Sequence, residues 1–179
     1  DLYLNAAEFG SPQARKRMFL VCDLAGTTVT KEQLLDTIEF AQTTARDIIS
    51  WDSHYKSKPL YGPTRAAATL ERAERAIAEL GENVPFIIVY YGSDYAGGWQ
   101  SLDAPLRTIT TIDRFGLVTW KDEVAYLRML QPDELLRGMG GRDEHVLPYG
   151  SRREKVKLCG NGVCSDVMTA IFSWIDLHR

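Results

Sequence analysis

The sequence predicts a mixed α+β fold, because patterns typical of strands and of helices alternate along its 179 residues. Apolar runs of strand length occur at Met18–Cys22 and Pro85–Tyr91. Between them, residues Thr64–Leu80 carry an apolar stripe at helical spacing, and Gly81 follows as a stop. A chain of this length forms one domain, or one and a part, and can bury a sizeable core.

The first half of the chain opens with a strand and a short helix. Because Met18–Cys22 is continuously apolar, we expect a strand that is buried on both faces of an α/β sheet. Thr30 and Gln33 have the spacing of a capping box, which predicts that a helix starts there.

The second half is expected to contain two strands and two helices. The strands are predicted at Leu106–Thr111 and Arg114–Val118, joined by a tight turn. Pro132 suits the first position of a helix, and a final helix is predicted from about Ser165.

Composition is that of an ordinary soluble protein, with 45% hydrophobic and 25% charged residues and a net charge of −3. This net charge does not indicate a nucleic-acid partner, although a local basic face can still bind phosphates. We see no signal peptide and no apolar run of membrane-spanning length, so we expect a cytoplasmic protein without a membrane partner. Cys22, Cys159 and Cys164 lack paired spacing, and the histidines are scattered, so neither a disulfide framework nor a metal site is expected.

The stretch Ser151–Val167 combines positive charge with glycine. Four cations lie within six positions, and Gly160-Asn161-Gly162 follows them. Glycines let the backbone approach a ligand closely, and a helix that starts just afterwards would offer free N–H groups. The alternative interpretation is a charged surface turn before the last helix, since short glycine motifs often match by chance. The four cations are Arg152, Arg153, Lys155 and Lys157.

Aromatic, hydroxyl and arginine side chains are interleaved between residues 92 and 115. Such side chains suit contact with phosphates and base edges, and they suit an ordinary β-meander equally well. The candidates for DNA contact are Tyr95, Trp99, Arg107, Thr108, Thr110 and Arg114.

Taken in order, four blocks resemble the carboxy-terminal half of a DNA (cytosine-5) methyltransferase. The block Gln13-x-Arg15-x-Arg17 is similar to the eighth motif of that family, and Thr108-Ile-Thr110 is similar to a step in its target-recognition domain. Arg128–Asp143 is similar to the ninth motif, and Lys155–Val163 is similar to the tenth. The resemblance implies that residues 1–24 are part of the catalytic α/β domain, which is of the S-adenosylmethionine-dependent methyltransferase type. It makes residues 25–127 the target-recognition domain and residues 128–179 a hinge and a helix returning to the catalytic domain.

The chain departs from the family pattern in several places. Gly141-Arg142 replaces the usual Phe-Pro of the ninth motif, Gly162 replaces a usual Ala or Ser, and Cys164 stands where Pro is common. The residue before each cysteine is Val or Leu, never the Pro of the family's Pro-Cys nucleophile. The family's glycine-rich cofactor loop and Glu-Asn-Val acid are also missing from the sequence.

The resemblance implies a mechanism in which a cytosine is flipped out of the duplex, a thiolate adds to C6, and S-adenosyl-L-methionine donates a methyl group to C5. Arg15 and Arg17 would be catalytic residues beside the base, with Arg17 donating to the cytosine O2 and stabilising negative charge on the ring. Gly160, Asn161 and Gly162 would bind the cofactor, which is held mainly by the absent amino-terminal half. Arg128 and Glu134 are expected to organise the hinge rather than to contact substrate.

The sequence is therefore consistent with two functions. In the first, the chain is the recognition part of a cytosine-5 methyltransferase, inactive alone, whose partners are double-stranded DNA and an amino-terminal half or subunit with the catalytic cysteine. In the second, it is a non-catalytic DNA-binding module derived from such an enzyme. Because the chain does not begin with Met, we expect a fragment or split subunit, in a bacterial or prophage restriction–modification setting near the nucleoid. Exposed apolar edges at Met18–Cys22 would let the isolated piece self-associate.

Overall fold

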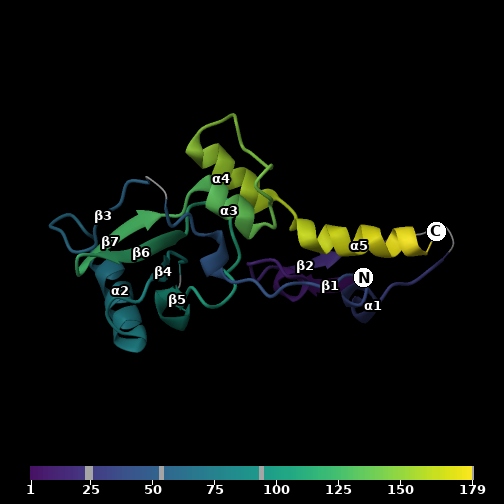
Figure 1. The fold of residues 1–179 in the computed structure, drawn as a ribbon, viewed down its shortest axis with the longest axis horizontal. Coiled ribbons are helices and arrows are strands. Elements are labelled where there is room, and N and C mark those ends of the chain that lie inside the picture. The colour runs from purple at the N-terminus through teal and green to yellow at the C-terminus, as the bar shows by residue number, and fades with distance from the viewer. Residues whose placement is uncertain (23–25, 53–54, 93–94, 179) are drawn as a thin grey trace.

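A computed structural model describes residues 1–22, 26–52, 55–92 and 95–178, apart from the side chains of Tyr95 and Ala96. It confirms the mixed α+β fold (Figure 1). One end of the molecule holds a five-stranded antiparallel sheet, which we call the sheet lobe (residues 55–129). The other end is an arm built from a two-stranded hairpin, a short helix and the carboxy-terminal helix, α5 (Ser165–Leu177). Helices α3 (Pro132–Gly138) and α4 (Arg152–Asn161) lie between the two.

The sheet lobe is organised around β4, whose four residues are all buried. Phe86 and Ile88 pack with helix α2, and Ile87 and Val89 pack into the central core on the opposite face, as expected for alternating side chains. The strand order is β3 (Lys58–Pro59), β7 (Val124–Met129), β6 (Phe115–Lys121), β4 (Phe86–Val89) and β5 (Trp99–Ser101), with α2 at Ala67–Leu80. The predicted strand at 85–91 and helix at 64–80 are thus confirmed, within a few residues at each end.

The arm corrects the prediction of a doubly buried strand at Met18–Cys22. The observed strand is β2 (Lys16–Phe19), which pairs antiparallel with β1 (Leu2–Asn5) in a two-stranded hairpin. Met18 is 57% exposed and Leu20 67% exposed. The prediction of burial is wrong for this chain because only one face of the hairpin is covered. Leu4 and Phe19 lie on that face and pack into the core.

Residues 106–111 do not form the predicted strand. Their hydrogen bonds go instead to the segment before β2: Leu106 donates its N–H to the Pro12 carbonyl at 2.8 Å, and Ala14 donates to the Leu106 carbonyl at 2.7 Å. Leu106 makes one isolated parallel bridge with Gln13. Strand β6 pairs instead with β4 and with β7, and β7 was not predicted. Its turn has Asp122 and Glu123 at positive φ, without the Asn-Gly or Asp-Gly pair that usually marks such a hairpin.

Three predicted helices are confirmed, namely α1 (Lys31–Leu35), α3 (Pro132–Gly138) and α5 (Ser165–Leu177). Thr30 and Gln33 form the expected capping box of α1, and Pro132 opens α3. The basic stretch is not a turn before the last helix but a helix of its own, α4 (Arg152–Asn161), because Ser151 and Glu154 cap its start. Short 3-10 turns occur at Ala6–Phe9, Ala45–Ile48 and Tyr95–Gly98.

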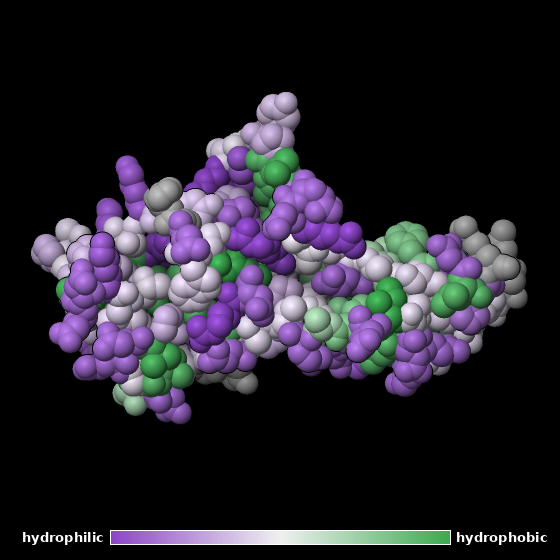
Figure 2. Space-filling view, viewed as in Figure 1, coloured by the Kyte–Doolittle hydropathy of each residue, from purple (hydrophilic) through white to green (hydrophobic). Residues whose placement is uncertain are grey.

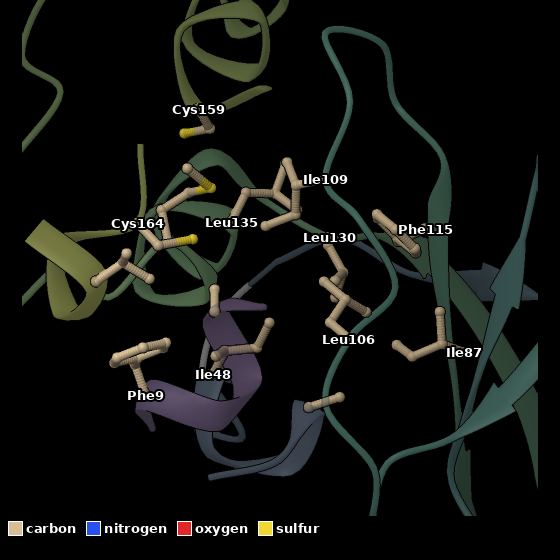
Figure 3. Close-up of a cluster of buried hydrophobic side chains, with 14 of the residues drawn as sticks. Phe9, Ile48, Ile87, Leu106, Ile109, Phe115, Leu130, Leu135, Cys159 and Cys164 are labelled. Carbon is tan, nitrogen blue, oxygen red and sulfur yellow. The ribbon is translucent and has the colours of Figure 1, made fainter. Parts of the chain in front are cut away.

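Helices α4 and α5 join the central core on one side of it. Figure 3 shows side chains from distant parts of the chain meeting there, among them Phe9, Ile48, Ile109, Leu135 and Cys164. By length and composition alone, the segment Arg152–Leu177 could cross a membrane, and 39% of its most apolar window is buried in this structure. The segment is divided into α4 and α5, and both helices pack in the core. These features are typical of a pair of core helices.

Candidate functional site

The side chains of Gln13 and Arg15 form hydrogen bonds to the loop at 106–111, to α3 and to α4. Gln13 is fully buried; its Oε1 accepts the N–H of Ile109 at 2.6 Å, and its Nε2 donates to the Gly138 carbonyl at 3.1 Å. Arg15 is 6% exposed and donates to the Ile109 carbonyl at 2.8 Å. Neighbouring side chains thus bind both the N–H and the carbonyl of Ile109, so the segment before β2 fixes the loop at 106–111.

Arg15 also holds the junction of α4 and α5. Its Nη2 donates to the carbonyls of Gly160 at 2.8 Å and Gly162 at 3.1 Å. Burial, and after it the nearby Arg17, lowers the pKa of Arg15 below its ordinary value, yet arginine stays charged in proteins. The guanidinium therefore satisfies three backbone carbonyls that would otherwise lack a donor.

Gly160 belongs to α4 rather than to a ligand-binding loop, and its packing explains why glycine stands there. A Cβ atom at this position would lie 2.3 Å from the carbonyl carbon of Thr110 and 2.4 Å from its oxygen. The helix thus touches the backbone of the Thr108–Thr110 step directly. The sequence-based interpretation recognised the close approach that glycine allows, but the structure places another segment of the protein there.

Replacing Gly160 with Ala should destabilise the chain by about 2–3 kcal/mol, because the obstructing atoms are backbone that cannot rotate away. Urea unfolding followed by circular dichroism measures this. Gly62→Ala is the matched control, because nothing lies within 4 Å of a Cβ at that position, and its stability should stay within about 0.5 kcal/mol. Equal stability of the two variants would contradict the packing described.

A cavity of about 180 Å³ lies between β2 and the α4–α5 junction. It brings Arg17 together with Asn161 and Gly162, residues predicted from separate motifs. The Arg17 side chain is exposed and donates to the Lys16 carbonyl at 2.7 Å, and the Asn161 side chain makes no hydrogen bond to the described residues. The lining residues are Ala6, Arg15, Arg17, Met18, Phe19, Asn161, Gly162, Val163, Cys164 and Val167.

The thiol that lines this cavity is a poor nucleophile. Burial raises the pKa of Cys164 to about 11, an effect that the nearby Arg15 only partly offsets. Burial also raises the pKa of Cys159, which lies in α4 and packs in the core. Because the thiolate is the reactive form, both side chains stay protonated and unreactive near neutral pH.

The residues predicted to contact DNA are anchored to backbone carbonyls. Arg107 donates to the Trp99 carbonyl at 3.0 Å, and Arg114 to that of Tyr90 at 2.6 Å. The hydroxyls of Thr108 and Thr110 donate to the carbonyls of Ala14 and Ile112 at 2.8 and 3.0 Å. These side chains lie on or beside one loop, which packs against α4 at Gly160.

Trp99 and Tyr95 were also predicted to contact DNA. The Trp99 side chain is half-buried in the sheet lobe, whereas that of Tyr95 lies outside the described part of the structure. A role of Trp99, Tyr95 or the 107–114 loop in DNA contact stays a prediction.

A comparison with known protein families gives one match. The sequence model of the family described as C-5 cytosine-specific DNA methylase matches residues 2–176. The chain belongs to this family. Searches of curated proteins and of solved structures gave no match. Family membership makes methyl transfer to cytosine in DNA the reaction class, and S-adenosyl-L-methionine the methyl donor that the family uses.

The cavity of this methylase chain is smaller than a typical ligand pocket. Ligand pockets commonly measure about 300–1,000 Å³, whereas this cavity measures about 180 Å³. It presents the amide of Asn161 and the apolar side chains of Val163 and Val167. Cofactor binding by Gly160, Asn161 and Gly162 stays a prediction.

Proposed function

We propose that this chain is the DNA-recognising, carboxy-terminal part of a cytosine-5 methyltransferase, and that another part or subunit supplies the nucleophile and most of the cofactor site. One observation carries the proposal. Arg15 of the first motif binds the carbonyl of Gly160, which lies 145 residues later in the last motif, and the cavity there also contains Arg17 and Asn161. Residues predicted from separate motifs to handle base and cofactor are thereby neighbours.

Within this site, each residue has a distinct task. The exposed Arg17 guanidinium can donate to the O2 atom of a flipped cytosine and stabilise the negative charge that develops on the ring. Arg15 fixes the backbone on which Asn161 stands, and Asn161 can bind a polar group of the cofactor. S-adenosyl-L-methionine supplies the methyl group when bound. The sheet lobe and the loop at 107–114 would contact the duplex as part of a target-recognition domain.

The arm supports docking of a further polypeptide part. Its hairpin exposes Tyr3, Met18 and Leu20 by 75%, 57% and 67%, and α5 exposes Phe172 by 59%. Hydrophobic residues are visible along the arm in Figure 2. Large exposed apolar side chains on one part of a molecule suit an interface more than a solvated surface. Burial also keeps the Cys164 thiol at the cavity protonated, which favours a nucleophile that is brought by the docked part.

The deciding experiment is tritium transfer from labelled S-adenosyl-L-methionine to mixed-sequence DNA. We expect no transfer from this chain alone and clear transfer once an amino-terminal part that carries Pro-Cys and Glu-Asn-Val is added. Transfer by the chain alone would mean that one of its own cysteines is the nucleophile. DNA binding without transfer in either sample would instead identify a non-catalytic binding module.

A further inference from the structure

Helix α4 presents a polar stripe that ends at the proposed active site. Arg153, Lys157 and Asn161 are spaced four residues apart, so they lie on one side of the helix, and all three are exposed. Each step of four residues advances about 6 Å along the helix axis. The last of the three lines the cavity that contains Arg17.

A groove of about 530 Å³ runs beside the first two residues of this stripe. Its opposite side is the end of the loop that carries the Thr108–Thr110 step. The lining residues are Thr111, Ile112, Asp113, Arg153, Val156 and Lys157. The groove therefore lies between α4 and the loop that carries the predicted DNA contacts.

The acidic groups nearest the groove are already engaged. Asp113 is ion-paired with Arg152, which also donates to the Leu130 carbonyl at 2.7 Å. The carboxylate of Glu154 accepts the N–H and the hydroxyl of Ser151, both at 2.7 Å, at the start of α4. Arg153 and Lys157 form no ion pair with the described residues, so they leave the groove positively charged.

We propose that this groove binds backbone phosphates of duplex DNA beside the target cytosine, so that Arg153 and Lys157 guide the strand toward Arg17 and Asn161. The groove is partly open to solvent, and the hydroxyl of Thr111, an exposed residue, can donate to a phosphate. Ile112, which is 58% exposed, offers an apolar surface to a sugar. This inference rests on the proposed function, because it assumes that DNA is bound.

The structure separates the cations that the sequence presents as one cluster. Arg152 is engaged by Asp113, and Lys155 lines a different pocket, next to Asp133 and Arg142. Of these four cations, Arg153 and Lys157 line the groove. The phosphate-binding pair is therefore four residues apart on one helical face, rather than the adjacent cations of the sequence.

The test measures binding of the 179-residue chain to a mixed-sequence duplex by fluorescence anisotropy at several salt concentrations. Arg153→Gln/Lys157→Gln should weaken binding at low salt by about tenfold or more. It should also reduce the slope of log K against log [salt] by about 1.8, because each lost phosphate contact removes about 0.9. The control is Arg142→Gln/Lys155→Gln, which also removes one arginine and one lysine but from a different pocket, and it should leave the slope nearly unchanged.

Two results would overturn the inference, and they are distinguishable. If the wild-type chain binds DNA but both double variants lose the same slope, the groove is not the phosphate site, while the proposed function survives. If the wild-type chain does not bind DNA at any salt concentration, the proposed function fails as well. Arg153→Lys/Lys157→Arg keeps both charges and should restore the wild-type slope, and circular dichroism confirms that each variant is folded.

Discussion

Replacing Glu134 with Gln should lower the free energy of unfolding by about 3–5 kcal/mol, the largest stability loss that we expect from a single polar substitution here. Glu134 is fully buried, and its carboxylate faces the guanidinium of Arg128 at 2.6 and 2.7 Å. It also accepts the N–H of Ser50 at 2.9 Å and that of Gln131 at 2.8 Å. A neutral amide would leave the Arg128 cation, whose side chain is 8% exposed, without its counter-charge.

The matched control breaks an exposed pair of the same kind. Arg46 and Asp103 lie 2.7 Å apart with side chains 43% and 67% exposed, so Asp103→Asn should cost less than about 1 kcal/mol. Urea unfolding of both variants decides the comparison. Adding Arg128→Met to Glu134→Gln should recover part of the loss, because the unpaired cation is then gone. If Glu134→Gln and Asp103→Asn cost the same, the buried pair does not hold α3 against β7 in the way the geometry indicates.

Local sequence signals predicted those elements whose cause is local. The Thr30–Gln33 box of α1 and Pro132 at the start of α3 are short-range features, and both were found where expected. The Ser151–Glu154 box of α4 is equally local and could have been recognised. It was overlooked because the cations and glycines after it suggested a loop.

Burial could not be predicted from apolar runs alone. Residues 86–89 and residues 18–22 look alike in sequence, yet β4 is buried on both faces and β2 is largely exposed. The difference lies in what covers each strand: β4 lies between α2 and the central core, whereas one face of β2 is open in this chain. Such cover is a tertiary property, which a run of hydrophobic residues does not encode.

The candidate site was predictable as a set of residues but not as a geometry. The resemblance to methyltransferase motifs named Arg15, Arg17, Gly160 and Asn161 together. It did not reveal that the guanidinium of Arg15 binds backbone carbonyls, whereas the side chain of Arg17 is exposed. Those hydrogen bonds join residues 94 and 145 positions apart, so no local spacing contains them.

The two arginines of the first motif should therefore respond oppositely to substitution. Arg15→Lys should cost about 3 kcal/mol of stability, because one ammonium cannot reach the carbonyls of Ile109, Gly160 and Gly162 that the guanidinium spans. Arg17→Ala should change stability by less than about 0.5 kcal/mol, since its side chain is exposed. Thermal and urea unfolding separate the two.

In the reconstituted methyltransferase, Arg17→Ala should lower the rate of methyl transfer about 100-fold or more, the loss typical of removing one donor that stabilises developing charge. DNA affinity should change only slightly, because the contact to O2 forms mainly as the ring becomes negative. Lys16→Ala is the control: it removes the neighbouring exposed cation, whose side chain points to the other face of β2, and it should leave the rate unchanged. Equal losses of rate and affinity in Arg17→Ala would assign Arg17 to phosphate binding, and the charge on the ring would then be stabilised by a group outside this chain.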